Sequence, residues 1–211
     1  MKQDTPQKIE ETIAAMEAHP VVAAILTRLD EEVPGRYTFH SASHSRDVLR
    51  EAVYFAVHDR RTPREIELIA IAAAFHDAGF IQGPVGHEAR GAEDAANAMR
   101  DYGGFTEEEI AQVRQMILDT QLLDGARGPC QRASIELSGY LLDADLSNFG
   151  RDDFFTRLDA IIQEQQTDEQ QLVRSTRDLM RRHTWITPAA QALRGEKKQG
   201  NIEALEAKVK G

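Results

Sequence analysis

The feature of this sequence that most constrains its fold is a long apolar segment that ends in two polar residues. Residues 63–78 read PREIELIAIAAAFHDA, and their spacing predicts a helix that is apolar over most of its circumference. Such a helix has to lie inside a core. His76 and Asp77 close the segment, so the sequence predicts an imidazole and a carboxylate at the end of a buried helix, beside the glycine-containing loop 81–86. We expect this loop to be mobile if substrate enters past it.

The rest of the chain has the same helical period. Thr62 and Thr106 each precede a first turn rich in glutamate, as helix N-caps do, and alternating runs of β-branched and aromatic residues are missing. We therefore predict an all-α fold, a compact multi-helix bundle with additional N- and C-terminal helices. The expected helices span residues 6–17, 20–32, 41–59, 63–78, 86–102, 106–119, 130–147, 151–165 and 168–183, with a weaker piece near 200–209.

Length and composition favour a single domain over residues 1–211. The chain has 211 residues and is 41% apolar, which is enough for one full-sized core. C-terminal helices are expected over 151–195. The end, 196–211, carries only a narrow apolar stripe and is predicted to be either a loosely docked helix or a mobile tail.

Several classes of protein and partner are disfavoured by composition. No apolar run reaches the roughly 18 residues that span a bilayer, and the first residues lack the apolar region of a signal peptide, so we expect a cytoplasmic protein with no membrane partner. The formal net charge of -10 disfavours polymeric nucleic acid as a partner. A small phosphorylated molecule stays compatible, because a bound cation sets the potential near it. Cys130 is the only cysteine, so a metal site within one chain has to use histidines and carboxylates.

Three groups of residues could form such a site. His40 and His44 lie one helical turn apart on a stripe that continues into Val48, although a single histidine is more often a surface residue. His76 and Asp77 would be costly to bury without a partner; the alternative is that Asp77 caps a loop while His76 bonds a carbonyl group. Asp143 and Asp145 interrupt a third apolar segment. Residues two positions apart on a helix face different directions, so at most one of these two carboxylates enters the site, and the spacing leaves open which.

The order and spacing of these groups resemble the HD superfamily of metal-dependent phosphohydrolases. The runs that carry the resemblance are Phe39–Val48 (FHSASHSRDV), Ala72–Phe80 (AAAFHDAGF), His87-Glu88 and Leu142–Leu146 (LDADL), and the similarity covers roughly residues 37–150. It implies His44, His76, Asp77 and Asp145 as metal ligands, with Asp145 fitting the family's pattern better than Asp143.

The resemblance also implies the chemistry. Two imidazoles and two carboxylates suit one divalent ion of manganese, iron, cobalt, nickel or zinc. The expected reaction is hydrolysis of a phosphomonoester or phosphodiester in a small, nucleotide-like molecule by metal-activated water. A non-hydrolytic member that senses a ligand or binds a protein partner is the alternative, and an oxygenase branch would need further histidines. The oligomeric state is left open, a homo-oligomer included.

Further residues are candidates for catalysis and for substrate binding. We expect His87 and Glu88 to assist acid–base chemistry beside Asp77, although His87 could instead bind a second metal. Binuclear branches carry another histidine where this chain has residues 117–122, which include none, so a single metal is favoured, with Asp119 in this stretch the alternative that would allow a second. The substrate-binding candidates are His40, Arg36, Arg46 and Arg90.

Overall fold

The apolar segment forms the central helix of the fold, α4 (Pro63–Phe75). In the computed structural model, which describes residues 6–125 and 128–210, every residue from Leu68 to Phe75 is at most 3% exposed. The helix contacts α2 (Pro20–Glu32), α3 (Ala42–His58), α5 (His87–Tyr102) and α6 (Glu107–Asp119). It is the buried helix that the sequence predicts.

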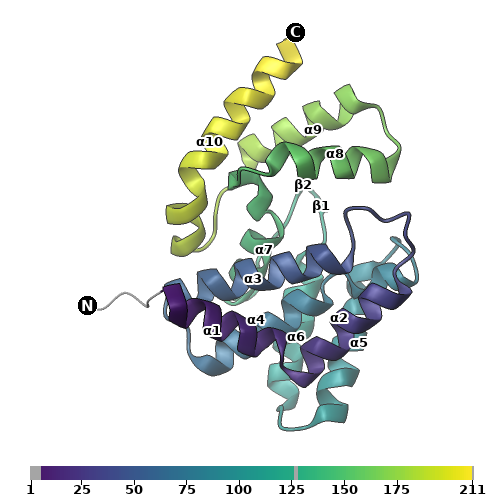
Figure 1. Cartoon of the computed structure of the whole chain (residues 1–211), viewed down its shortest axis with the longest axis vertical. Coiled ribbons are helices and arrows are strands. Elements are labelled where there is room, and N and C mark those ends of the chain that lie inside the picture. Colours follow the sequence, from purple (N-terminus) through teal and green to yellow (C-terminus); the bar gives the residue numbers. More distant parts are fainter. Residues whose placement is uncertain (1–5, 126–127, 211) are drawn as a thin grey trace.

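The remaining elements are also mostly helical. They are α1 (Pro6–Glu17), α7 (Ser138–Asp145), α8 (Phe154–Gln165), α9 (Glu169–Arg182) and α10 (Pro188–Lys210), with short 3-10 helices at Ala78–Ile81 (η1) and Ser147–Gly150 (η2). Figure 1 shows α8, α9 and α10 gathered on one side of the molecule, with α7 between them and the N-terminal helices. The all-α prediction is confirmed, with one small addition: β1 (Leu123–Gly125) and β2 (Gly128–Cys130) form an antiparallel hairpin.

Helix starts follow the predicted capping. The Thr62 side chain accepts a hydrogen bond from Glu65 N, and the Glu65 carboxylate accepts one from Thr62 N, which together form a capping box. Thr106 and Glu109 repeat the arrangement at α6. Both N-caps read from the sequence are confirmed.

Two helix boundaries differ from the prediction. The predicted helix 130–147 begins only at Ser138, because Ser134 N and Oγ both donate hydrogen bonds to the Asp119 carboxylate at 2.7 Å and hold the preceding segment in a loop. The segment 63–78 leaves the α-helix after Phe75, and Asp77 lies outside it with φ -103° and ψ 6°.

The C-terminus departs most from the prediction. The end predicted as a loose helix or a tail belongs to α10, which is continuous to Lys210 and buries Ile202 and Leu205; residue 211 lies outside the described residues. Thr187-Pro188 repeats the Thr62-Pro63 pattern and is the signal in the sequence that marks this start.

Across the described ranges, no single helix is long and apolar enough to cross a membrane. Helices α1 and α2 pass that test of length and composition only as a pair, and the chain bends by 71° between them. Apolar residues of both helices, among them Ile13, Val22 and Ile25, are buried in the hydrophobic core.

Candidate metal centre

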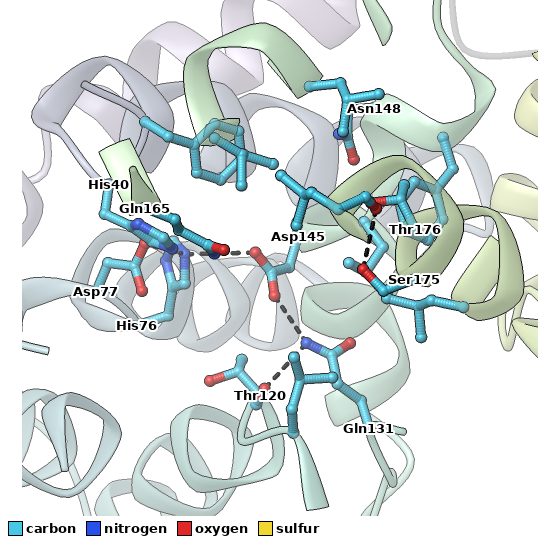
Figure 2. A pocket seen from close by; sticks show the side chains of 18 of the residues that line it. His40, His76, Asp77, Thr120, Gln131, Asp145, Asn148, Gln165, Ser175 and Thr176 are labelled. Carbon is cyan, nitrogen blue, oxygen red and sulfur yellow. Dashed lines mark hydrogen bonds and ion pairs between the residues drawn. The ribbon is translucent and has the colours of Figure 1, made fainter. Parts of the chain in front are cut away.

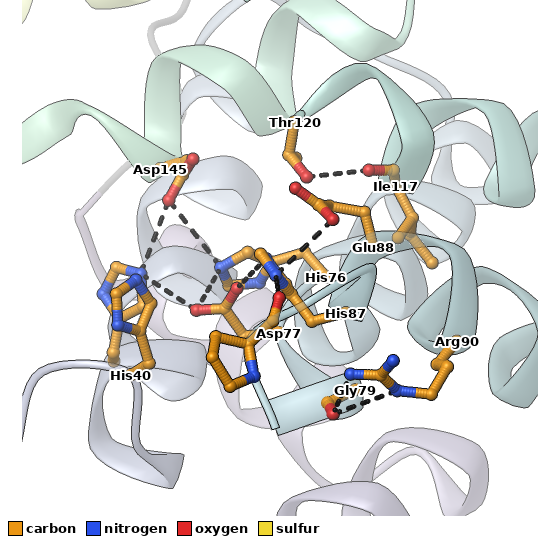
Figure 3. A network of polar contacts seen from close by, with 12 residues as sticks. His40, His76, Asp77, Gly79, His87, Glu88, Arg90, Ile117, Thr120 and Asp145 are labelled. Carbon is orange, nitrogen blue, oxygen red and sulfur yellow. Dashed lines mark hydrogen bonds and ion pairs between the residues drawn. The ribbon is translucent and has the colours of Figure 1, made fainter. Parts of the chain in front are cut away.

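Four side chains from the ends of three helices converge on one point. His44 lies in the first turn of α3, His76 and Asp77 follow α4, and Asp145 is the last residue of α7. His44 Nε2 is 3.6 Å from Asp77 Oδ2 and 3.4 Å from Asp145 Oδ1, and His76 Nε2 is 3.2 Å and 3.7 Å from the same two atoms. Figure 3 shows His76, Asp77 and Asp145 pointing toward one another. The structure thus brings all four predicted ligands together.

Three of the four side chains are buried, and two of their donor atoms have no hydrogen-bond partner among the described residues outside the cluster. His44, His76 and Asp77 are at most 5% exposed. Within the described part of the chain, His76 Nε2 and Asp77 Oδ2 have no hydrogen-bond partner. Their contact with each other, at 3.2 Å, is the shortest that each atom makes within the cluster, and a cation between them would satisfy both. Ligand atoms of His44, His76 and Asp145 lie within 4.8 Å of one another, so the donor set fits a single metal ion.

The ends of the helices orient these atoms. His76 Nδ1 lies 2.7 Å from the Ala73 carbonyl oxygen, so the carbonyl contact considered as an alternative is present and leaves Nε2 facing the cluster. Asp77 makes no side-chain hydrogen bond that caps η1, in contrast to the alternative interpretation of Asp77. Its carboxylate is therefore available to the cluster.

Two glycines allow α5 to approach the end of α4. A Cβ atom at Gly79 would lie 2.2 Å from the His87 carbonyl oxygen, and one at Gly91 would lie 2.4 Å from the Phe75 carbonyl oxygen. Any larger residue would push the helices apart. This close packing places His87 Nε2 at 3.4 Å from Asp77 Oδ1.

The two aspartates of α7 have different partners. Asp145 Oδ2 accepts a hydrogen bond of 2.8 Å from Gln131 Nε2, which turns Oδ1 toward the histidines. The Asp143 carboxylate points elsewhere and accepts hydrogen bonds from Ile186 N, Thr187 N and Thr187 Oγ1, just ahead of α10. Asp145 is therefore the carboxylate that reaches the cluster, and Asp143 anchors the start of α10.

Gln131 is a positioning residue that the sequence did not reveal. Its amide nitrogen also donates to the Thr120 carbonyl oxygen at 3.0 Å, which fixes the side chain between α6 and Asp145. Partners of metal ligands typically contribute about 10- to 100-fold to metal affinity. We expect Gln131→Ala to weaken the binding of manganese or zinc by about this factor in a calorimetric titration.

A matched control for this prediction is Gln199→Ala. Gln199 donates to the Glu203 carboxylate at 3.1 Å, so it makes the same kind of amide–carboxylate contact on the exposed face of α10. Its replacement should leave metal affinity unchanged. Equal affinities for the two variants would show that Gln131 does not orient Asp145.

The charged side chains of the cluster shift one another's pKa values. Burial lowers the pKa of His76, but the negative charges of Asp77 and Asp145 outweigh this effect and raise the pKa to about 9. Burial opposes the ionisation of Asp77, yet the neighbouring His76 holds the pKa of the Asp77 carboxyl well below its usual range. In the metal-free protein at pH 7 the pair is thus an imidazolium beside a carboxylate.

Metal binding should therefore release a proton. A ligating imidazole has to be neutral, and His76 is protonated below about pH 9 when no metal is bound. We expect about one proton to leave per metal bound at pH 7, and metal affinity to rise between pH 7 and pH 9. Calorimetry in buffers of different ionisation enthalpy measures this number. Binding with no proton release would contradict the ligand role of His76.

His87 and Glu88 lie beside the cluster as predicted. His87 Nδ1 is 2.8 Å from the Pro84 carbonyl oxygen and 3.4 Å from Glu88 Oε2. Burial lowers the pKa of His87, but its hydrogen bond to Asp77 outweighs this effect and raises it. Both side chains line the same cavity as Asp77.

His40 is held by a residue from the C-terminal helices. Its Nδ1 is paired with Glu164 Oε1, and Glu164 Oε2 accepts hydrogen bonds from Phe39 N and His40 N. The Glu164 side chain is only 6% exposed, although the glutamine-rich stretch around it looks like a solvated surface. The His40 ring stacks on Phe80 with centroids 4.2 Å apart. This fixes the imidazole at the edge of the cavity.

The three arginines predicted to bind substrate are not brought to the cavity. Arg46 pairs with Asp30 on α2, and Arg36 contacts the Tyr37 hydroxyl at 3.0 Å. Arg90 donates to the carbonyl oxygens of Gly79 and Val85 at 3.0 and 2.6 Å, and also to that of Gly83. None of the three arginines lines the cavity, and the guanidinium group of Arg90 holds together carbonyl groups of the loop after α4.

A cavity of about 520 Å³ connects the cluster with the C-terminal helices. Figure 2 shows His40, His76 and Asp77 at one end and Ser175 and Thr176 of α9 at the other. The lining residues from α8 and α9 lie beyond the motifs read from the sequence, so they were not predicted. A volume of this size is typical of small-molecule sites.

No protein-family model matches the chain, and no curated protein matches it in sequence. Its function therefore has to be inferred from the side chains and their geometry.

Proposed function

We propose that the protein is a metal-dependent phosphohydrolase of the HD superfamily, which hydrolyses a phosphomonoester or phosphodiester in a small molecule. The observation that carries the proposal is the convergence of four donor atoms, two of them buried without hydrogen-bond partners among the described residues outside the cluster, at one end of a ligand-sized cavity. The resemblance of the surrounding motifs to the HD superfamily favours phosphate esters over other substrates.

His44, His76, Asp77 and Asp145 would hold one divalent ion in this proposal. The mixed nitrogen and oxygen donor set suits manganese, iron, cobalt, nickel or zinc. When bound, such an ion polarises a phosphoryl oxygen and lowers the pKa of a water molecule toward neutrality.

The neighbouring side chains of the chain can handle the protons. His40 has one ring nitrogen paired with Glu164, so the other is free at the cavity edge. Burial lowers the pKa of His40, but Glu164 and Asp77 outweigh it and raise this pKa, which favours a protonated ring. His40 can therefore donate a proton from Nε2 to the oxygen of the leaving group. The Glu88 carboxylate, beside His87, can accept the proton that the attacking water loses.

A substrate screen tests this proposal. The protein is purified without chelator and assayed for phosphate release from a panel of nucleotides, simple phosphomonoesters and phosphodiesters, with manganese, cobalt or nickel added. We expect release that chelator removes and added metal restores. Bound metal without turnover of any ester would contradict the hydrolase proposal and favour the non-hydrolytic ligand-binding alternative.

A further inference from the structure

The end of the cavity opposite the metal cluster is apolar. Its wall is formed by side chains from η2, α8 and α9, and we call it the apolar wall: Phe149, Phe154, Leu158, Ile161, Leu172 and Leu179. The first three are at most 4% exposed and belong to the core. The last three are only partly buried and present aliphatic surface to the cavity. A ligand that reaches from the cluster to this wall would bury apolar atoms there.

Besides the charged Asp178 and Arg182 of α9, this end of the cavity carries neutral polar groups. Asn148 and Thr176 line the cavity, and neither side chain has a hydrogen-bond partner among the described residues. Figure 2 shows both on the side of Asp145 that lies away from His76 and Asp77. They can bond a neutral polar atom of a ligand, but they offer no positive charge.

The balance of charge in the cavity limits the number of phosphate groups that a ligand can carry there. Arg182 is the one lysine or arginine among the described lining residues. Asp178 and Glu88 line the cavity together with the carboxylates of the cluster, and the whole chain carries a formal charge of -10. A triphosphate would need several cationic partners besides a metal ion. A single phosphoryl group would need only the metal ion held by the cluster.

We propose that the substrate, within the phosphohydrolase function proposed above, is the monophosphate ester of a predominantly apolar organic group, such as an aryl or medium-chain alkyl phosphate. The phosphoryl group lies at the metal cluster, and the organic group lies against the apolar wall. Nucleoside triphosphates are disfavoured, because Arg182 is the one cationic side chain among the described lining residues.

A homologous series of ligands tests the proposal without relying on turnover. Metal-loaded protein is titrated calorimetrically with n-alkylphosphonates from ethyl to octyl, which cannot be hydrolysed at the carbon–phosphorus bond. Transfer of each methylene group to the apolar wall should raise affinity about three- to fourfold until the wall is covered. The matching alkyl phosphates are then assayed for hydrolysis, and kcat/KM should rise in parallel, with ATP a poor substrate.

Variants of the apolar wall test whether the dependence of affinity on chain length arises there. We expect Leu172→Gln and Leu179→Gln each to lower the octyl-to-ethyl ratio of affinities by about tenfold or more, because an amide replaces aliphatic surface. The matched control is Leu193→Gln, which changes a partly buried leucine of α10 outside the cavity and should keep the wild-type ratio. The wild-type series decides the question even where a variant fails to fold.

The outcomes separate this proposal from the proposed function. Affinity that does not change with chain length, no binding of any phosphonate, or a preference for ATP over octyl phosphate would each overturn the assignment of the apolar wall. Hydrolysis of ethyl phosphate with a flat series would leave the hydrolase proposal intact while overturning this one. A steep binding series without hydrolysis would support the apolar wall and contradict the hydrolase proposal.

Discussion

Replacing His76 by alanine is expected to weaken metal binding by more than about 100-fold, because loss of a ligand should cost more than loss of a ligand's partner. His76 is 1% exposed, and its Nε2 lies within 3.7 Å of carboxylate oxygens of both Asp77 and Asp145. His44 contacts the same two oxygens but is itself one of the four ligands, so the set falls from four to three when His76 is lost. Phosphate release should fall to the background rate, since water activation depends on the bound ion.

Calorimetric metal titration and the phosphate-release assay check this result together. His58→Ala is the control, because His58 lies at the C-terminal end of α3 with its side chain 38% exposed. This variant should retain wild-type affinity and activity. Unchanged metal affinity in His76→Ala, with helicity retained by circular dichroism, would contradict the assigned site.

The two aspartates of α7 should give opposite results when each is replaced by alanine. Asp143→Ala removes the acceptor for the buried N–H group of Thr187 and the partly buried one of Ile186, so we expect the free energy of unfolding to fall by about 2–4 kcal/mol. Asp145→Ala leaves Asp77 beside the His76 imidazolium, so in the metal-free protein it should cost less than Asp143→Ala.

Urea denaturation of the metal-free variants measures the stability difference, and metal titration of the folded variants completes the comparison. Asp145→Ala should lose metal affinity by more than about 100-fold, whereas folded Asp143→Ala should keep it. Loss of metal affinity in Asp143→Ala with little change in stability would mean that Asp143, and not Asp145, is the metal ligand.

Local patterns in the sequence predicted the parts of the fold and site that depend on local geometry. The apolar segment before His76 required a buried helix, and the capping residues Thr62 and Thr106 marked helix starts that the structure confirms. The spacing of Asp143 and Asp145 indicated that only one of them could enter the site. It could not select between them, because the choice depends on contacts with Gln131 and with the segment before α10.

The residues that the sequence missed act through long-range contacts. Glu164 reaches His40 across 124 residues, and Gln131 reaches Asp145 from a loop that carries no periodic pattern. Arg90 looked like a phosphate ligand because it follows the motifs closely, yet its nearest acceptors are backbone carbonyl groups. Periodicity and capping describe one element at a time, so they do not report which side chains meet between elements.

The most direct test of the central claim is the metal content of the protein. The wild-type chain and His76→Ala are purified without chelator, incubated with excess manganese or zinc, desalted and analysed by elemental mass spectrometry. We expect close to one metal ion per wild-type chain and close to none per His76→Ala chain. A wild-type chain that holds no metal, or a variant that holds as much as the wild type, would contradict the metal centre formed by His44, His76, Asp77 and Asp145, and two ions per wild-type chain would contradict a single-metal site.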